Sequence, residues 1–456
     1  MSASNDFLPS LAIPTEIAAR IFLLTLPEAP VSPNLQNAPL LLTRVSRGWR
    51  TIALGTSELW ESLAIDTKIL GLAVSRPDFL DGIRRWLLSA SSRPLSVTLS
   101  AGGPAIPDGI LELLRVHTAS SGLRRLDSDL PLGHTIKLLD HGSDVLNDLE
   151  IYLSDMASFF GGPDPAHIRT LTATIVGSPH LTRLHLSDLL TGLLPLVFES
   201  KSDALQELTD LLYFPDPGEN LQTIFALPHL RKLCLAKAQV LATVHLPISP
   251  LWPPAPQIQE LQLKGEHPSI LRRLTLPSLK TMHIDLSGQG PNQGAHDFAD
   301  FIARSQCPLE SLEVHIAWTL EGILPAIVLP AVPMIRHLEI IEGANGLGHL
   351  LQLVLLTRQL NGAFLVPQLR SLTIVDDLGQ WGDRFSGYGT LQTAFRARNA
   401  GLEIVKFLDP EFDEDEDFDD DVREWMDLEE ELLRQIVDEW DTRVIVKLGE
   451  EEHVVE

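Results

Sequence analysis

The feature that most constrains the fold is a short apolar phrase, L-x-x-L-x-L or a close variant, that recurs from residue 123 onward. Apolar side chains at alternating positions predict a short β-strand with one buried face. The second apolar positions of successive copies lie 13 to 34 residues apart, and most gaps are between 21 and 30 residues. Two copies, at 168–175 and 204–211, are weaker than the others. The clear copies occupy 123–130, 146–153, 181–188, 230–237, 258–265, 279–286, 309–316, 335–342 and 369–376.

A unit of 20 to 29 residues with one strand is typical of a leucine-rich repeat, whose units stack into a curved solenoid. The segment 79–100 is predicted as a helix followed by a strand, which would form a first unit. We therefore expect an α/β fold with a curved, irregular solenoid over residues 64–408, in which the leucines form the core. Helical spacing of apolar residues predicts helices between strands in PDGILELLRVHTAS (107–120), AHDFADFIARS (295–305) and LGHLLQLVLLTRQL (347–360).

Polar side chains lie between the apolar positions of the strand phrase and are expected on the concave side of the sheet. Solenoids of this kind usually bind partners there. Ordinary solvated sheet residues are the alternative interpretation for each of them. The central exposed positions are His185, Cys234, Gln262, His283, Glu313, Glu339 and Thr373. The candidate substrate-binding residues are Arg183, His185, Lys232, Gln262, Lys264, His283, Glu313, His315, His337 and Glu339.

Short helices are predicted in the first sixty residues. Apolar residues recur at helical spacing over 13–27, where Pro14 suits the first helical position and Glu16 suits the positive N-terminal end. After a loop with four prolines, LLLTRVSRGWRTIAL (40–54) predicts one or two further helices. Helices this short bury little surface on their own. They are either a cap on the end of the solenoid or a segment that binds a partner.

These helices resemble an F-box, and the Leu-Trp pair that follows them matches the version common in mushroom-type fungi. Two positions depart from the pattern, because Ile13 stands where Leu is usual and Ser46 where Cys is common. The matching positions are Ile13-Pro14-x-Glu16-Ile17, Ile21-Phe22, Val45-x-Arg47-x-Trp49-Arg50 and Leu59-Trp60.

The resemblance implies a short tail at 1–7 and a three-helix F-box at 8–63. This F-box would bind a Skp-type adaptor and, through it, a cullin ubiquitin ligase. Trp49 is expected to be a partly exposed aromatic anchor, and Trp60 to seal the junction with the first repeat. The residues implied to form or support the adaptor-binding surface are Ile13, Pro14, Ile17, Ile21, Leu42, Val45 and Trp49.

The C-terminal segment 409–456 is strongly acidic, with 22 acidic and 4 basic residues. We predict a capping helix at 425–436 and a short strand at 443–448. The carboxylates at 413–424 partly match the spacing of a calcium-binding loop. Phe418, however, stands where that loop requires glycine, so a solvated acidic segment without metal is favoured.

Several classes of function are disfavoured. The net charge of −26 argues against binding to nucleic acid or to an anionic membrane surface. The sequence has no phosphate-binding loop, nucleophile elbow or zinc-protease motif, so we expect no enzymatic activity, no cofactor and no metal. Cys234 and Cys307 are too far apart in sequence for a metal-type pair. The two cysteines, together with an N-terminal sequence that lacks the pattern of a secretory signal, indicate a reducing compartment, cytoplasmic and/or nuclear.

The expected function is that of a substrate receptor in a Skp–cullin–F-box type ubiquitin ligase, whose repeats bind an unknown protein substrate. The alternative is a leucine-rich-repeat scaffold without a role in degradation, whose N-terminal helices are only a cap. Binding to the adaptor distinguishes the two.

Overall fold

The structure is a computed structural model of the 456-residue chain. It divides into two compact units, Met1–Leu211 (unit 1) and Leu212–Glu456 (unit 2). The residues described are 13–27, 30–102, 105–139, 143–153, 164–190, 192–200, 205–215, 221–236, 251–264, 268–285, 293–316, 327–342, 365–376, 404–409, 443–448 and 451–455.

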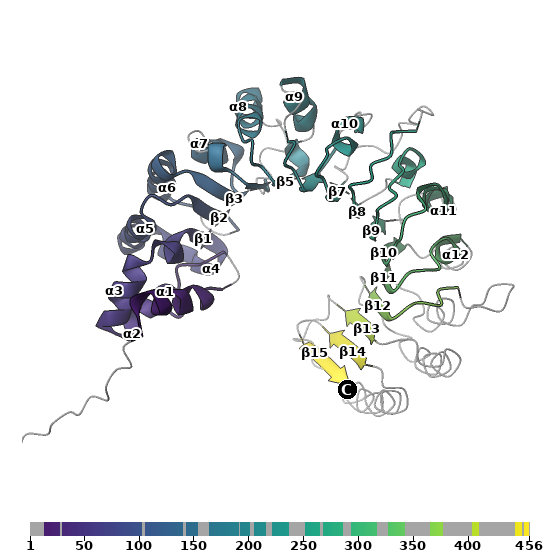
Figure 1. Cartoon of the computed structure of the whole chain (residues 1–456). Helices are drawn as coiled ribbons and strands as arrows, with labels where there is room; N and C mark the ends of the chain where they lie inside the picture. Colours follow the sequence, from purple (N-terminus) through teal and green to yellow (C-terminus); the bar gives the residue numbers. More distant parts are fainter. Residues whose placement is uncertain are drawn as a thin grey trace, which may run out of the picture. The chain divides into compact units, whose positions relative to one another are not determined.

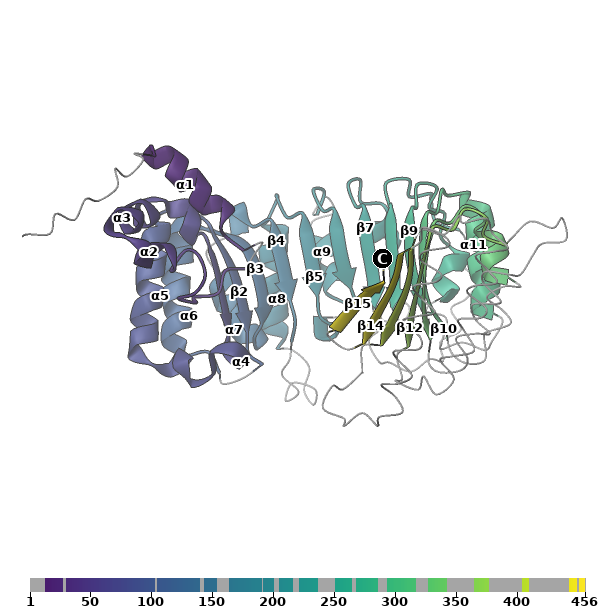
Figure 2. The same ribbon diagram turned by 90° about the horizontal axis from the view of Figure 1, so that it is seen from below.

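Unit 1 is built on strands that lie side by side in the order in which they occur along the chain (Figure 2). Each strand from β1 to β5 pairs in parallel with the next. β6 begins at the end of this unit, where the backbone N–H groups of Thr209 and Asp210 donate to the Thr182 carbonyl. The strands are β1 (Ser62–Asp66), β2 (Leu95–Ser100), β3 (Leu123–Asp129), β4 (Asp148–Ile151), β5 (Arg183–Leu186) and β6 (Asp210–Tyr213).

Helices connect these strands because parallel neighbours need a crossover. In Figure 1, α5 to α9 lie on one side of the strands. The leucines of the strand phrase point to that side and are buried, as the alternation in β2 and β3 shows. The helices and short 3₁₀ turns are α4 (Thr67–Leu70), η2 (Gly71–Ser75), α5 (Pro77–Ala90), α6 (Asp108–Ser121), α7 (Leu132–Leu139), η3 (Ser143–Val145), α8 (Pro165–Val176), η5 (Asp188–Leu190) and α9 (Leu193–Ser200).

Three helices and a 3₁₀ turn precede β1. They are α1 (Thr15–Leu24), α2 (Leu42–Val45), α3 (Arg47–Gly55) and η1 (Ser57–Trp60). The prediction of helices here is confirmed, with one change at the start. Pro14 is the cap residue of α1 and not its first helical residue. Glu16 lies in the first turn as expected.

Unit 2 continues the same pattern. Its strands from β7 to β14 pair in parallel in chain order. β15 then pairs with β14 antiparallel. The strands are β7 (Lys232–Ala236), β8 (Glu260–Lys264), β9 (Thr281–Asp285), β10 (Ser311–Ile316), β11 (His337–Glu342), β12 (Ser371–Asp376), β13 (Ile404–Asp409), β14 (Arg443–Leu448) and β15 (Glu451–Val455). The helices among the described residues of this unit are α10 (Gln222–Phe225), the 3₁₀ turn η6 (Pro268–Arg272), α11 (Gln293–Ser305) and α12 (Leu329–Ala331).

Most of the strand predictions are confirmed, but the weak copy at 168–175 is wrong, and the weak copy at 204–211 is displaced from its strand. The segment 168–175 lies in α8, where Leu171 and Ile175 are buried one helical turn apart. Asp164 caps that helix by accepting a hydrogen bond from Ala166. The copy at 204–211 ends where the strand begins, since β6 starts at Asp210. Helices at 107–120 and 295–305 are confirmed as α6 and α11, and the strand at 443–448 as β14.

Two residues expected to be exposed on the sheet are buried instead. Cys234 is paired across the sheet with Gln262, and Thr373 with Glu339. A short side chain beside a longer one in the neighbouring strand is covered by it. The helices predicted at 347–360 and 425–436 and the acidic stretch 413–424 lie outside the described residues.

Gly122 gives a prediction about stability. It follows α6 with a φ of 87°, and a Cβ added there would lie 2.5 Å from Cγ2 of Val145. Gly122→Ala is expected to lower the free energy of unfolding by about 2 kcal/mol or more. Alanine is strained at a positive φ, and its methyl group would overlap the Val145 side chain. Chemical denaturation measures the change. Gly82→Ala is the control, because Gly82 lies in α5 with no atom near the added methyl group. It should stabilise the helix by about 0.5–1 kcal/mol, and equal effects of the two changes would contradict this account.

Candidate functional site

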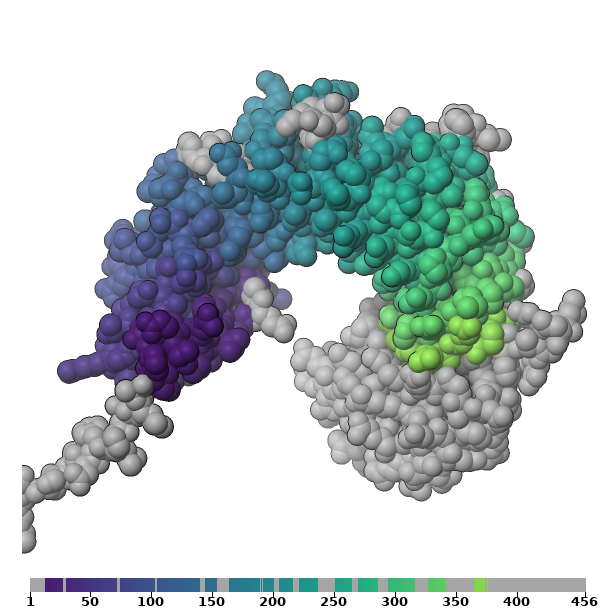
Figure 3. All heavy atoms as spheres, in the orientation of Figure 1, coloured from purple at the N-terminus to yellow at the C-terminus, as the bar shows by residue number. Residues whose placement is uncertain are grey.

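A row of exposed isoleucines lies along α1. Ile13, Ile17 and Ile21 are 53%, 48% and 44% exposed. Ile17 and Ile21 are one helical turn apart on one side of α1, away from the buried Phe22, and Ile13 lies just before the helix. Val45 and Trp49, from α2 and α3, are exposed to a similar degree. We refer to Ile13, Ile17, Ile21, Val45 and Trp49 as the N-terminal apolar residues. Figure 3 shows α1 to α3, in dark purple, at the surface of unit 1.

Trp49 is held in place although it is partly exposed. Its ring packs against Phe22 with the two centroids 4.8 Å apart and the planes inclined by 50°. Its backbone N–H donates to Oγ of Ser46, which caps α3. Nε of Arg50 donates to the Thr43 carbonyl and so joins α3 to α2. The expectation of a partly exposed tryptophan is therefore confirmed, with its position fixed by contacts to α1 and to the α3 cap.

Trp60 connects the N-terminal helices to the first strand–helix unit, as predicted. It is buried, and its Nε1 donates to the Ala53 carbonyl at 2.8 Å. Nε1 of Trp86 in α5 donates in turn to the Trp60 carbonyl. The two indole rings meet edge to face with centroids 5.0 Å apart. These contacts attach α3 to the body of unit 1.

Leu42 differs from the other residues predicted for adaptor binding. It is buried, so it supports the surface from below and does not form it. Pro14, in contrast, is exposed beside Ile13. Leu24, Leu41 and Leu54 are also exposed, and sequence reasoning did not include them among the candidate residues. Leu24 could have been predicted from its spacing, because it follows Ile17 by two helical turns and so lies on the same side of α1.

A network of charged side chains crosses the open face of unit 1, the face of its strands opposite α5–α9. Glu150 in β4 is at its centre and is only 8% exposed. One of its oxygens accepts from Arg125 at 3.2 Å and lies 3.6 Å from Arg183. Its other oxygen lies 3.6 Å from Nδ1 of His185. Asp210 completes the arrangement, with its oxygens 3.2 Å from Nε2 of His185 and 3.4 Å from Nε of Arg183.

Strand register produces this network. Arg125, Asp148 and Arg183 share one row across β3, β4 and β5, and Asp127, Glu150 and His185 share the next row. Arg183 and His185 were predicted as open-face residues. Arg125, Glu150 and Asp210 were missed, although Arg125 and Glu150 occupy the same kind of position in their copies of the strand phrase.

The pKa values in the network follow from these contacts. Burial alone would lower the pKa of His185, but hydrogen bonds to Asp210 and Glu150, together with their charges, raise it to about 9. The hydrogen bond with His185 lowers the pKa of Glu150 more than burial raises it. Burial raises the pKa of Asp127, and the charge of Glu150 adds to this effect. His185 is therefore protonated at neutral pH and balances the carboxylates around it.

This pKa predicts a pH dependence of stability. The pKa of His185 is raised from 6.5 to about 9 on folding, so its contribution is complete below about pH 6.5 and is lost as the pH rises through 9. His185→Gln should lower the free energy of unfolding by roughly 2–3 kcal/mol at pH 6. The difference between wild type and variant should shrink as the pH approaches 10. Urea denaturation at several pH values tests this, and a difference that is constant with pH would contradict it.

The remaining candidate residues lie on the strands of unit 2, where they form smaller groups. Nζ of Lys232 lies 2.9 Å from Glu260, which also accepts from Gln262. His283 contacts Glu313, and the pKa of Glu313 is lowered by that hydrogen bond and, less strongly, by Lys264 and His315. His337 and Glu339 follow on β11, opposite Ser311 and Glu313. Unlike Glu150, none of the candidate residues in these groups is fully buried.

Within the described residues, no group of three or more His, Cys, Asp or Glu side chains is placed to hold a metal ion. The same residues include no helix with the length and apolar character needed to cross a membrane. No protein-family model matches the sequence, and a search of curated proteins gives no match.

Proposed function

We propose that this chain is a substrate-receptor subunit of a Skp–cullin–F-box type ubiquitin ligase. In this proposal α1 to α3 are an F-box that binds a Skp-type adaptor. The parallel strands with their connecting helices are a leucine-rich-repeat solenoid that holds the substrate. The protein contributes proximity, and ubiquitin transfer is carried out by other subunits.

The observation that carries the proposal is the exposure of the N-terminal apolar residues. A helix that served only as a cap would turn its apolar side chains toward the body of the protein. Here α1 buries Ala18 and Phe22 and leaves Ile13, Ile17 and Ile21 in solvent. A fixed, half-exposed tryptophan beside them is the kind of residue that contributes most at protein interfaces.

One feature of unit 1 is compatible with the alternative, a scaffold whose N-terminal helices are only a cap. Trp60 and Trp86 attach α3 firmly to unit 1. That attachment is equally needed in a ligase receptor, because the adaptor and the substrate must be held at a fixed distance. The attachment therefore does not favour the scaffold over the receptor.

The test is co-expression of the full chain with a fungal Skp-type adaptor, followed by size-exclusion chromatography. The proposal predicts that the two proteins co-elute in equal amounts. If the folded chain elutes alone, the ligase proposal fails, and the N-terminal helices are a cap.

A further inference from the structure

The open face of unit 1 carries more negative than positive charge. Strand register places its polar side chains in rows across β1 to β6, and carboxylates outnumber cations in these rows. Arg124, at the start of β3, is paired with Glu61, so these two charges cancel. Among the described residues of the rows, the carboxylates are Asp66, Asp127, Asp129, Asp148, Glu150 and Asp210, and the cations are Arg125, Arg183 and His185.

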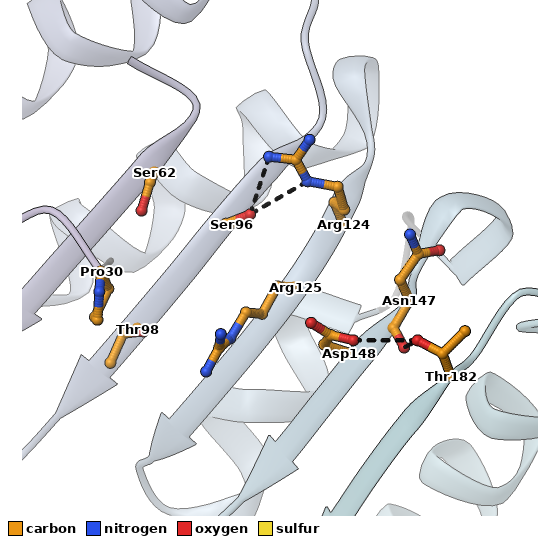
Figure 4. A pocket seen from close by; sticks show the side chains of 9 residues that line it. All are labelled: Pro30, Ser62, Ser96, Thr98, Arg124, Arg125, Asn147, Asp148 and Thr182. Carbon is orange, nitrogen blue, oxygen red and sulfur yellow. Dashed lines mark hydrogen bonds between the residues drawn. The ribbon is translucent and has the colours of Figure 1, made fainter. Parts of the chain in front are cut away.

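The cations of this face are concentrated at the start and the middle of the strands. Figure 4 shows a pocket at the start of β1 to β4, where Arg124 and Arg125 lie. Arg125, Arg183 and His185 all contact the carboxylate of Glu150. The positive charge of the face is therefore used mainly to balance this one buried carboxylate and its neighbour in β6.

The carboxylates toward the end of β3 are compensated less well. Nη2 of Arg125 lies 4.0 Å from Asp127, at the limit of an ion pair. Burial raises the pKa of Asp127, and the charge of Glu150 raises it further. Asp129 is partly exposed and forms no ion pair with any described residue. Its Oδ1, which the protein covers, receives no hydrogen bond from the described residues, so its charge is not balanced locally.

An aromatic ring lies beside these carboxylates. Tyr152 follows β4 and is 40% exposed. Its backbone N–H donates to the Ser128 carbonyl, one position beyond the last paired residues of β3 and β4, so that Tyr152 lies next to Asp129. Its hydroxyl lies 3.5 Å from Oε2 of Glu150. Burial, followed by the charges of Glu150 and Asp127, raises the pKa of Tyr152 to about 12. The ring is therefore a neutral phenol in a region of negative charge.

An exposed aromatic ring with uncompensated carboxylates beside it suits a cationic side chain. The face of the ring attracts a cation, and the carboxylates accept its N–H groups. Arginine fits better than lysine, because a planar guanidinium stacks on a ring while it donates to more than one carboxylate.

We propose that the end of β3 and β4 on the open face binds an arginine side chain in an unmodified segment of a partner protein. The guanidinium would stack on the ring of Tyr152 and donate to Asp127 and Asp129. That the partner is a ubiquitylation substrate rests on the function proposed above.

The test uses a display library of unmodified twelve-residue peptides, selected on the purified full chain without any adaptor. Peptides that also bind the Tyr152→Leu variant are removed, which discards binders of other surfaces. The remaining peptides are expected to share an arginine. A synthetic peptide of the best sequence, with both ends blocked, is then measured by fluorescence polarisation. Replacing its arginine with citrulline, which has nearly the same shape and no charge, should weaken binding about tenfold or more.

Asp129→Asn in the protein should cause a similar loss, and Asp127→Asn provides a second variant in case the first perturbs folding. Asp148→Asn is the matched control for charge. Asp148 lies on the same face four residues before Tyr152, about 13 Å away along the strand, which is beyond the screening length of about 8 Å at physiological salt. It should leave peptide binding within about twofold. Tyr152→Phe keeps the aromatic ring and should also bind nearly as well as the wild type.

Several results would overturn the proposal. They are the absence of remaining peptides, selection without a shared arginine, unchanged binding of the citrulline peptide, and a loss in Asp148→Asn equal to the losses in Asp129→Asn and Asp127→Asn. Thermal denaturation shows whether each variant is folded. Co-elution with the adaptor is measured separately, so the ligase proposal and this one can fail independently.

Discussion

Ile17→Asp is expected to weaken binding of a Skp-type adaptor at least 100-fold. Ile17 lies at the middle of the row on α1 and is about half exposed, so an aspartate there can remain hydrated in the free protein. In a complex the new carboxylate would be buried among apolar side chains without a partner, which costs several kcal/mol. Trp49→Ala should also weaken binding strongly, because a fixed aromatic side chain of this size contributes about 2 kcal/mol or more at an interface.

Thr15→Asp is the control for the added charge, because Thr15 is exposed and points to the other side of α1 from Ile17. It should bind the adaptor like the wild type. Biolayer interferometry with immobilised adaptor gives the dissociation constants. Thermal denaturation of the free proteins shows whether each variant is folded. If a folded Ile17→Asp protein retained wild-type affinity, the row on α1 would not be the adaptor-binding surface.

Glu150→Gln is expected to give the largest loss of stability among the changes considered, about 3 kcal/mol in the free energy of unfolding. The side chain is almost fully buried and faces three cationic groups, Arg125, Arg183 and His185. Removing its charge leaves these groups close to one another with less compensation, and breaking a buried ion pair typically costs about 3–5 kcal/mol. Partial exposure of both arginines places the expected value at the low end.

Glu112→Gln makes the same chemical change at an exposed ion pair with Arg115 and is expected to have no measurable effect. Urea denaturation at pH 7 compares the two variants. In the double variant Glu150→Gln with Arg125→Gln the losses should not add, because the two side chains form one interaction. Equal, small effects at Glu150 and Glu112 would show that the network does not stabilise unit 1.

Most strands of the two units could be predicted from the sequence because one short phrase recurs in them, whereas β13 and β15 were not predicted. Alternation of leucines with polar residues is a local pattern, and the second leucine of each copy, such as Leu126 or Leu184, is buried as expected. The error at 168–175 arose because Leu171 and Ile175 fit both a strand and a helix, and the helix cap at Asp164 decides between them. β1 was missed because only Leu63 to Ile65 carry its apolar signal.

The exposed row on α1 was predictable from spacing and from the F-box resemblance, but the open-face network was not. Glu150 and Asp210 are 60 residues apart and meet through His185 because strand register aligns their positions. The register between neighbouring strands depends on the lengths of the segments that connect them. These lengths vary too much in this chain for the register to be predicted from the sequence.

Hydrogen–deuterium exchange of the full chain, alone and with a Skp-type adaptor, tests the central claim most directly. The technique reports where backbone amides become protected when a partner binds. The account predicts protection in the peptides that cover α1 and α2–α3, with no change in those that cover β7 to β12 of unit 2. Absence of protection in α1 and α3 at saturating adaptor, or protection only in the strands of either unit, would contradict it.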